Sequence, residues 1–470
     1  MRALFQHHFH PTILRAYDIR GIIGETLNEA DAHALGIGFA AMLRDQGGKR
    51  IALGRDGRLS SPMLETALAE GLVRGGMEVL RIGCGPTPML YFASYRLKAD
   101  AAIQVTGSHN PPNHNGFKMV VGQKPFFADA ISRLGTDLAA GVSTASGGSN
   151  REVSIEAEYL AALLGENPDS VCDDQTCIIW DCGNGATGPL TEALTARLNG
   201  RHQVLFADID GRFPNHHPDP VDPATLTLLR QAVAAESADL GIGFDGDGDR
   251  IGLIDARGRQ VPGDLLTAFL ARGSLRRHPG AEVIFDVKSS LAALATVSAL
   301  GGRPQLWKTG HSHIKTRLRE TGAPLAGEMS GHLFIADGYY GFDDALFAAM
   351  AVLREIAEGG QSITDFMDHL PPIHATPELR IPCADETKFS TIASVVADTR
   401  ENPPADDCEI ADMDGIRVTS DEGWWLIRAS NTGAELVARA EGRDAAALEK
   451  LSHEIETRLQ RAGLDWSMEN

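Results

Sequence analysis

Three aspartates stand at alternate positions directly after an apolar run. The segment ADLGIGFDGDGDRIGLID (238–255) carries Asp245, Asp247 and Asp249, separated by glycines. Carboxylates this close repel one another unless a cation neutralises them, and glycine lets the backbone turn tightly enough for all three to reach one ion. Oxygen ligands alone suit Mg²⁺ or Ca²⁺. The spacing predicts a site for a hard divalent cation; a solvated acidic turn is the simpler alternative.

Two other motifs overlap these aspartates and fit them poorly. Gly241, Gly243 and Gly246 match the dinucleotide pattern G-x-G-x-x-G, but the following RIGLID is typical of a strand rather than a helix. The aspartates would also repel a pyrophosphate. An EF-hand loop needs a glycine where Arg250 stands and an acid where Ala256 stands.

A second loop combines hydroxyl, amide and imidazole groups where an apolar run ends. In AAIQVTGSHNPPNHNGFKM (101–119) that run leads into Ser108, His109 and Asn110. Reactive groups of α/β enzymes often lie where a strand ends, and a serine hydroxyl needs a base or a metal to become a nucleophile. The segment indicates a reactive Ser108, although Ser, Asn and Pro also form ordinary polar turns.

The segment LAGEMSGHLFI (325–335) offers groups for a hydroxyl-rich ligand. Glu328, Ser330 and His332 alternate along it, which would place all three on one side of an extended strand. A carboxylate and a hydroxyl on one side could bind two sugar hydroxyls. A polar strand face without a ligand is the alternative.

The segment WWLIRASNTGAELVARAEG (424–442) offers groups for an anion. Arg428, Ser430, Asn431 and Thr432 follow an apolar run. The planar fork of an arginine, together with hydroxyl, amide and backbone donors, suits a phosphate. A capped loop without a ligand is the alternative.

Strand-length and helix-length patterns alternate over most of the chain and would position these loops. Predicted strands cover 50–56, 78–83, 101–107, 177–183, 238–245, 251–256 and 282–287, and predicted helices include 28–47, 61–76 and 222–237. This alternation predicts α/β units with parallel sheets. Two segments, 136–154 and 371–379, are typical of linkers. After the second, strands near 416–420 and 424–430 and a helix over 444–463 predict a smaller α+β domain.

The bulk composition is that of a globular protein. The 470 residues are 43% hydrophobic and 23% charged, and their number favours about three domains, within a range of two to four. The net charge of -20 argues against a nucleic-acid partner. Any phosphate site must therefore be built from locally gathered Arg, Lys and backbone N–H groups.

Targeting and redox signals are weak. The N-terminal segment lacks the apolar core of a signal peptide, and no run approaches the roughly 18 apolar residues of a membrane span. The six cysteines form no C-x-x-C pair, which favours reduced structural thiols. We expect a cytoplasmic protein with no membrane partner, and a monomer, with a dimer as the alternative.

Eight segments, taken in chain order, resemble the α-D-phosphohexomutase superfamily, above all its bacterial phosphomannomutase/phosphoglucomutase members. They span 17–432 and read YDIRG, GRDGRLSSP, TGSHNPP…NGFK, FDGDGDR, FDVKSS, KTGHSHIK, GEMSGH and RASNT. The resemblance implies three related α/β domains with mixed or parallel sheets, plus a smaller C-terminal α+β domain, around a central active-site cleft. The implied boundaries are 1–152, 153–258, 259–371 and 372–470.

The resemblance also implies an activity, reversible phosphoryl transfer between hexose 1-phosphate and hexose 6-phosphate of mannose, glucose or both. A phosphoserine would carry the group and a hexose 1,6-bisphosphate would be intermediate and activator. The implied alternatives are a phosphoglucosamine mutase and a Mg²⁺-dependent sugar phosphatase. Sugar phosphates would be the partners.

The resemblance assigns residues to these steps. Mg²⁺ would be held by Ser108, Asp245, Asp247 and Asp249. The implied catalytic residues, with Lys118 and His311 as acid/base candidates, are Ser108, Lys118, His311, Arg20, Arg250 and His109. The implied substrate-binding residues are Lys288, Glu328, Ser330, His332, Arg428, Ser430, Asn431 and Thr432.

The phosphate loop departs from the family pattern. The family usually has a proline two residues after the threonine, whereas this chain continues Gly433-Ala434-Glu435. We expect a looser loop, and we expect Glu435 to disfavour an anionic substrate.

Overall fold

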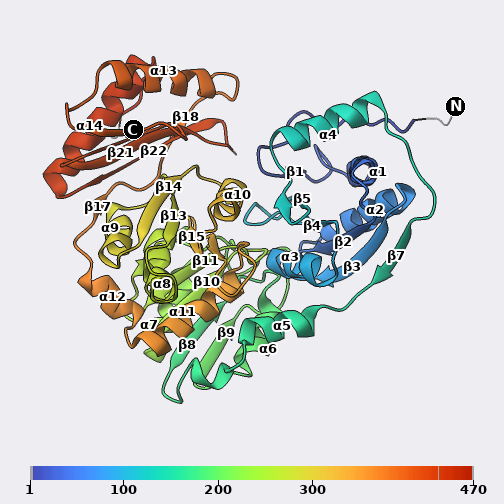
Figure 1. Ribbon diagram of the computed structural model, residues 1–470, viewed down its shortest axis with the longest axis horizontal. Coiled ribbons are helices and arrows are strands. Elements are labelled where there is room, and N and C mark those ends of the chain that lie inside the picture. The colour runs from blue at the N-terminus through green and yellow to red at the C-terminus, as the bar shows by residue number, and fades with distance from the viewer. Residues whose placement is uncertain (1–3, 432, 468–470) are drawn as a thin grey trace.

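The computed structural model describes residues 4–431 and 433–467, which form three α/β sheets and one antiparallel sheet (Figure 1). Each strand predicted from an apolar run is present within two residues of its expected ends. The fold class is confirmed. In Figure 1 the first sheet (blue) and the fourth (red) lie on opposite sides, and the second and third (green to orange) lie between and below them.

The first sheet has the order β1-β5-β4-β2-β3-β7, with β6 paired to β5. Strands β4, β2, β3 and β7 run parallel, and β5 runs antiparallel to β4 and β1. An apolar, fully buried strand such as β4 requires cover on both faces, and helices supply it. The elements are β1 (Ile19–Ile22), α1 (Glu29–Asp45), β2 (Arg50–Arg55), α2 (Ser61–Arg74), β3 (Glu78–Cys84), α3 (Thr87–Arg96), β4 (Ala101–Val105), β5 (His114–Val121), β6 (Lys124–Pro125), α4 (Asp129–Ala140) and β7 (Ser149–Glu152).

Strand β7 corrects the expected linker at 136–154. Its residues are all exposed, and it joins the edge of the first sheet through backbone pairing with β3. Because no side chain of this strand enters a core, the sequence has no apolar pattern to reveal it.

The second sheet has the order β12-β11-β10-β8-β9, and the aspartate segment joins two of its strands. Strands β10 and β11 are antiparallel, so the chain turns back within 245–250. The elements are α5 (Glu156–Leu164), a 3-10 helix (Pro168–Ser170), β8 (Cys177–Asp181), α6 (Gly188–Thr195), β9 (Arg201–Leu205), α7 (Thr227–Glu236), β10 (Leu240–Phe244), β11 (Ile251–Asp255) and β12 (Gln260–Val261).

The third sheet has the order β14-β13-β15-β16. Its elements are α8 (Gly263–Arg277), β13 (Glu282–Asp286), α9 (Leu291–Ala299), β14 (Arg303–Trp307), α10 (His311–Thr321), β15 (Leu325–Gly327), β16 (Leu333–Ile335), α11 (Ala345–Gly359) and α12 (Ile363–His369). The single extended strand expected over 325–335 is wrong. The chain forms two short antiparallel strands with a turn at 328–332 between them, because Gly331 there takes a positive φ of 84°.

The fourth sheet is antiparallel, with the order β17-β22-β21-β20-β19 and β18 paired to β22. Its elements are β17 (His374–Ala375), β18 (Leu379–Pro382), α13 (Lys388–Glu401), β19 (Glu409–Ala411), β20 (Ile416–Ser420), β21 (Gly423–Ala429), β22 (Glu435–Gly442) and α14 (Ala445–Arg461).

The first three sheets share one hydrophobic core, and the fourth sheet has a core of its own. One contiguous cluster takes residues from the first three sheets, among them Ala52, Trp180 and Phe285. The fourth sheet has a separate core, and a small group around Trp424 and Val287 joins it to the third. The first three sheets therefore form one packed body, and the fourth meets it through a smaller contact. No described helix has the length and apolar character needed to cross a membrane.

Candidate active site

The three aspartates converge on the serine loop. Asp245, Asp247 and Asp249 are fully buried, and each offers an oxygen within 4.8 Å of the others. The Ser108 hydroxyl donates to Asp245 Oδ2 at 3.0 Å. A Cβ on Gly246 would lie 2.6 Å from the Ser108 carbonyl oxygen, so only glycine lets the turn come this close.

This centre has more negative than positive charge. Lys118 donates to Asp247 Oδ2 at 2.8 Å and also to Asp249, while Asp247 Oδ1 and Asp249 Oδ1 are buried without a hydrogen-bond partner among the described residues. Burial and the two neighbouring carboxylates raise the pKa of Asp245 well above its usual value. Unpartnered buried carboxylate oxygens are costly, so this all-oxygen set fits a hard divalent cation.

Lys118 lies among the aspartates as a cation. Burial alone would lower its pKa, but Asp247, Asp249 and Asp245 raise it well above the usual value. In this arrangement the ammonium can donate a proton but cannot accept one.

A buried arginine fixes the backbone of the serine loop. Arg58 donates to the carbonyl oxygens of Ser108 (2.7 Å), Pro111 (2.6 Å), His114 (3.0 Å) and Asn110. Ser108 itself has a φ of +49°, a conformation uncommon outside glycine. These four bonds fix a strained backbone, which aims the hydroxyl at the aspartates.

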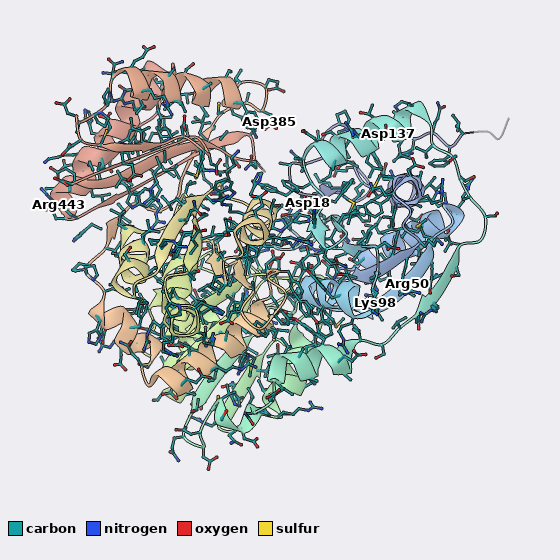
Figure 2. The ribbon with its side chains drawn as sticks, viewed as in Figure 1. Asp18, Arg50, Lys98, Asp137, Asp385 and Arg443 are labelled. Atoms are coloured by element: carbon teal, nitrogen blue, oxygen red, sulfur yellow. The ribbon has the colours of Figure 1, made fainter. Side chains whose placement is uncertain are left out.

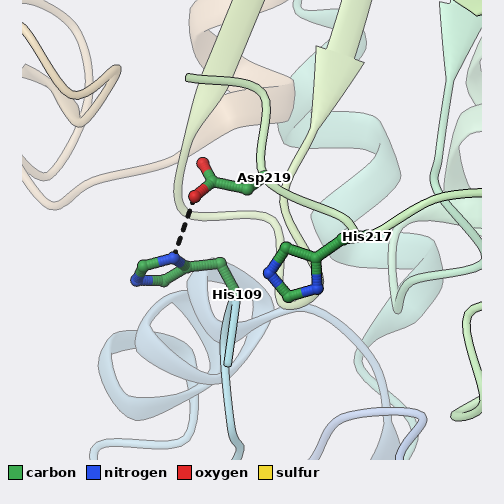
Figure 3. Close-up of side chains that lie close together, drawn as sticks. All are labelled: His109, His217 and Asp219. Atoms are coloured by element: carbon green, nitrogen blue, oxygen red, sulfur yellow. Dashed lines mark hydrogen bonds and ion pairs between the residues drawn. The ribbon is translucent and has the colours of Figure 1, made fainter. Parts of the chain in front are cut away.

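His109 leaves the serine loop toward the second sheet (Figure 3). Its Nδ1 lies 3.1 Å from Asp219 Oδ2, and His217 stands beside the pair. The positive charge of Arg250, followed by burial, lowers the pKa of His109 to about 4. His109 is therefore a neutral imidazole at neutral pH in this structure.

Two histidines, His311 at the start of α10 and His332 in the turn between β15 and β16, lie against one buried carboxylate. His332 Nδ1 lies 3.1 Å and His311 Nδ1 lies 3.4 Å from Asp343 Oδ2, and the two rings stack at 5.4 Å. Arg250 Nε donates to His332 Nε2 at 3.0 Å. Burial and the Lys315 ammonium lower the pKa of His311 to about 4, so this ring is also neutral at neutral pH and can accept a proton.

Arg20 faces the same serine loop from β1. Its guanidinium donates to Asn110 Oδ1 at 2.7 Å and to Asp18 Oδ2 at 2.5 Å. Figure 2 labels Asp18 on the side of the first sheet that faces the third and fourth sheets. Arg20 Nε is buried without a partner among the described residues, which leaves it a donor for an anion.

The expected sugar-binding residues lie in the turn between β15 and β16. Glu328 is buried and accepts from the Gly310 backbone N–H at 2.6 Å. Ser330 is half-buried in the same turn. Lys288, at the end of β13, pairs with Glu378 at 2.9 Å.

The expected phosphate loop follows β21. Arg428 Nε donates to Asp414 at 3.0 Å, while its Nη2 is buried without a partner among the described residues. The Ser430 hydroxyl accepts from the Gly433 N–H at 3.0 Å. Asn431 donates to the Tyr17 hydroxyl, which itself donates to the Thr309 carbonyl oxygen at 2.9 Å. Thr432 lies outside the described residues.

The expected site residues therefore come from loops of all four sheets. Tyr17 joins the first sheet to loops of the third and fourth, and Ser108 joins the first to the second. Segments more than 400 residues apart contribute to one constellation.

Models of four phosphoglucomutase/phosphomannomutase domains match the chain in order. Alpha/beta/alpha domains I, II and III match residues 11–136, 157–258 and 262–373, and the C-terminal domain matches 378–458. A phosphomannomutase/phosphoglucomutase of Pseudomonas putida is 40% identical over 450 residues, which cover 96% of each chain. The chain belongs to the phosphoglucomutase/phosphomannomutase family. The resemblance drawn from the eight motifs is confirmed.

Two further relatives are about as similar in sequence, and a more distant solved structure shares the fold. A phosphoglucomutase of Neisseria gonorrhoeae is 39% identical over 94% of this chain and 95% of its own. The crystal structure of a family protein from Burkholderia thailandensis has a TM-score of 0.89 at 38% identity and covers 97% of this chain and 98% of that one. A Thermus thermophilus structure, described as a putative phosphomannomutase, shares the fold with a TM-score of 0.80 at 19% identity over 96% of this chain and all of that one.

Several residues of the site escaped the sequence analysis. Arg58 lies in a quoted motif, but its role depends on four carbonyl groups that no sequence pattern reveals. Tyr17 and Asp343 act across long sequence separations. Asp219 lies in the polar segment FPNHHPDP, whose density of His, Asp and Pro was the available signal.

Two contacts offset the departure of the phosphate loop from the family pattern at Gly433-Ala434-Glu435. Glu435 pairs with Arg380 Nη1 at 2.5 Å, and the Lys388 ammonium donates to the Gly433 carbonyl at 2.8 Å. The charge expected to repel an anion is thus partly neutralised, and the loop expected to be loose is tied to α13.

Proposed function

We propose that the protein interconverts hexose 1-phosphate and hexose 6-phosphate, with phosphoserine at position 108 as the carrier and a hexose 1,6-bisphosphate as the intermediate and activator. Glucose and mannose phosphates are the proposed substrates. The observation that carries the proposal is the hydrogen bond from the Ser108 hydroxyl to Asp245, one of three clustered buried carboxylates, beside Asp247 and Asp249, each of which has one oxygen without a hydrogen-bond partner among the described residues.

Mg²⁺ is the proposed metal, held by Asp245, Asp247, Asp249 and an oxygen on Ser108. When bound, it would withdraw negative charge from the phosphoryl group on that serine. Protein side chains would do the remaining work. Arg20, with its unpartnered Nε, and Arg250 would hold phosphoryl oxygens, and His109 would contact the same group.

Two residues are proposed to move protons. The neutral His311 imidazole would take the proton from the attacking sugar hydroxyl as the new O–P bond forms and the Ser108 Oγ–P bond breaks. The Lys118 ammonium beside the aspartates would donate a proton or neutralise the serine oxygen that leaves.

The other end of the substrate would lie at the fourth sheet. Arg428, Ser430, Asn431 and Thr432 would hold the phosphate that does not react, and Lys288, Glu328, Ser330 and His332 would bind sugar hydroxyls. Turning the bisphosphate around would exchange the two phosphates between the loop and Ser108, which completes the isomerisation.

A sugar phosphatase is the second candidate, because it would use the same metal centre and serine and would end with water. The proposed second phosphate loop argues against it. A phosphoglucosamine mutase differs only in the substrate.

Purified enzyme, Mg²⁺ and a trace of glucose 1,6-bisphosphate test all three candidates. We expect isomerisation of glucose 1-phosphate and mannose 1-phosphate to exceed that of glucosamine 1-phosphate, with little inorganic phosphate released. Phosphate release as fast as isomerisation would favour the phosphatase, and full activity of the dephosphorylated enzyme without added bisphosphate would contradict the proposed intermediate.

The arrangement of the chain belongs to the proposal as well. We place domains at 1–152, 153–258, 259–371 and 372–470; β12 (Gln260–Val261) lies just past the second of these boundaries, although it pairs with β11 of the second sheet. A cytoplasmic monomer is proposed from the sequence, and light scattering on the purified protein would test the monomer.

A further inference from the structure

Lys288 already has a carboxylate partner. Its Nζ lies 2.9 Å from Glu378 Oε2, and the lysine is 7% exposed. Glu378 stands immediately before β18 of the fourth sheet, whereas Lys288 follows β13 of the third. The ion pair therefore crosses from one sheet to the other, beside the residues proposed to bind substrate.

The backbone around Lys288 is fixed by the fourth sheet too. Arg439 donates to the Lys288 carbonyl at 2.9 Å. Arg417 donates to the carbonyls of Val287 (2.6 Å) and Ser289 (2.8 Å). Because this turn is held at three successive carbonyls, a change of partner at Lys288 can occur in the side chain without moving the backbone.

Glu378 lies among several cations. Its Oε1 accepts from Arg380 at 3.0 Å, and the positive charges of Lys288, Arg380 and Arg428 all favour its ionised form, so its pKa is lowered. A carboxylate among a lysine and two arginines has the surroundings that a phosphate or a polarised sugar oxygen would also prefer. Its side chain is 21% exposed, so it can move aside into solvent.

We propose that Glu378 is a positioning residue that serves as the resident counter-ion of Lys288 and releases the lysine to the incoming substrate. The proposal rests on the proposed function, because it takes Lys288 as a substrate contact. Between turnovers Glu378 holds the ammonium in place. With substrate bound, its negative charge keeps the anion from binding too tightly.

The consequence is a limit on affinity that favours turnover. A bisphosphate that must turn around has to leave the phosphate loop in every cycle. Binding energy gained equally by the bound state and the transition state lowers KM without raising kcat, and a tighter hold on the intermediate slows its release. Removing the charge of Glu378 should therefore lower both KM and kcat.

The test is Glu378→Gln, which keeps the shape and removes the charge. We expect KM for glucose 1-phosphate to fall about two- to fivefold, the range set by losing a partly exposed ionic interaction, and kcat to fall by a similar factor. Glu378→Asp retains the charge and should restore KM toward the wild-type value. Glu422→Gln, which loses an ion pair with Lys450 on the outside of the same sheet, is the matched control and should change neither constant.

A double-mutant cycle shows whether the effect passes through Lys288. With Lys288→Met as background, Glu378→Gln should no longer change KM. A KM that rises in Glu378→Gln, or an unchanged effect in the Lys288→Met background, would overturn the inference. Thermal melting of each variant separates these results from loss of the fold.

Calorimetry keeps this inference distinct from the proposed function. Inorganic phosphate and glucose 1,6-bisphosphate should both bind more tightly to Glu378→Gln than to the wild-type enzyme, whether or not the enzyme isomerises sugars. No gain in affinity for either ligand overturns the counter-ion role. Isomerase activity that is absent while affinity rises would contradict only the proposed function.

Discussion

The two charged ends of the site balance their charges in opposite ways. At the Ser108 end, three fully buried aspartates lie beside one ammonium that bonds to two of them, and two of their oxygens lack a hydrogen-bond partner among the described residues. At the other end three cations each have a carboxylate partner, in the pairs Arg428–Asp414, Lys288–Glu378 and Arg380–Glu435, and Arg380 also bonds to Glu378.

The difference shows how one site can retain one ion and exchange another. Buried carboxylates with no freedom to move create a deficit that only a cation can fill, and such a cation should stay through the cycle. The paired end has side chains that are 15–21% exposed on the acidic side, and solvent can take over a displaced carboxylate. A bisphosphate that must let go and return is suited to this second arrangement.

Replacing Ser108 should have the largest effect. Ser108→Ala removes the proposed carrier, so kcat should fall by about 10³-fold or more, as for other nucleophiles, while binding of glucose 1,6-bisphosphate persists. Steady-state kinetics and calorimetry on the same preparation measure both. Retention of a tenth of the wild-type kcat would mean that Ser108 does not carry the group.

Mg²⁺ should stabilise the protein by binding to the three aspartates at the Ser108 end of the site. Mg²⁺ at about 100 times its Kd should add about 2.7 kcal/mol to the free energy of unfolding, visible as a higher Tm in calorimetric scans. Asp247→Asn should abolish this gain, and Asp412→Asn, an exposed pair with Arg400, should preserve it.

In the metal-free protein, the charge of Asp245 should lower the stability of the fold. Because burial and its neighbours raise the pKa of Asp245 above 3.8, the stability contributed by this group is present at low pH and is lost as pH rises through the raised pKa. Asp245→Asn should therefore raise the Tm of the metal-free protein at neutral pH. A lower Tm in this variant would show that the three carboxylates do not repel one another as described.

Removing the positive charge of Arg428 from the phosphate loop should weaken substrate binding. Arg428→Met should raise KM about 10- to 100-fold, since hydrogen bonds to charged groups contribute about 1.5–3 kcal/mol, with a smaller change in kcat. Arg400→Met, at the exposed Asp412 pair, serves as control. A kcat loss without a change of KM would place Arg428 at the reacting end instead.

Removing the Tyr17 hydroxyl, which bonds across the site, should have a smaller effect on KM than removing the charge of Arg428. Tyr17→Phe removes a hydroxyl that bonds to Asn431 and to the Thr309 carbonyl, worth about 0.5–1.5 kcal/mol each. KM should rise about two- to tenfold. Tyr340→Phe, at an exposed ring, should be neutral, and equal effects of the two substitutions would remove any role for Tyr17 in joining the sheets.

The sequence predicted the features that rest on local patterns. Apolar runs located the strands that carry Ser108 and the aspartates, and alternating glycines indicated the tight turn. It missed the turn at Gly331 because alternation of polar residues is typical of a strand, whereas one positive φ interrupts it. It missed β7 because an exposed edge strand has no apolar pattern.

The partners of the site residues depend on tertiary structure. Arg58 meets carbonyl groups 50 to 56 residues away, and Glu378 meets Lys288 from another sheet. The charge of Glu435 suggested repulsion from the sequence alone, but Arg380 across the strand pair partly neutralises it. Residue types predicted which groups gather, and only the fold shows how each charge is balanced.

A crystal soaked in Mn²⁺ as a substitute for Mg²⁺ tests the central claim most directly. The account predicts one anomalous peak coordinated by Asp245, Asp247 and Asp249, with an oxygen on Ser108 completing the set and Lys118 displaced from the aspartates. The absence of a peak there, or a peak that leaves Ser108 out of reach, would contradict it.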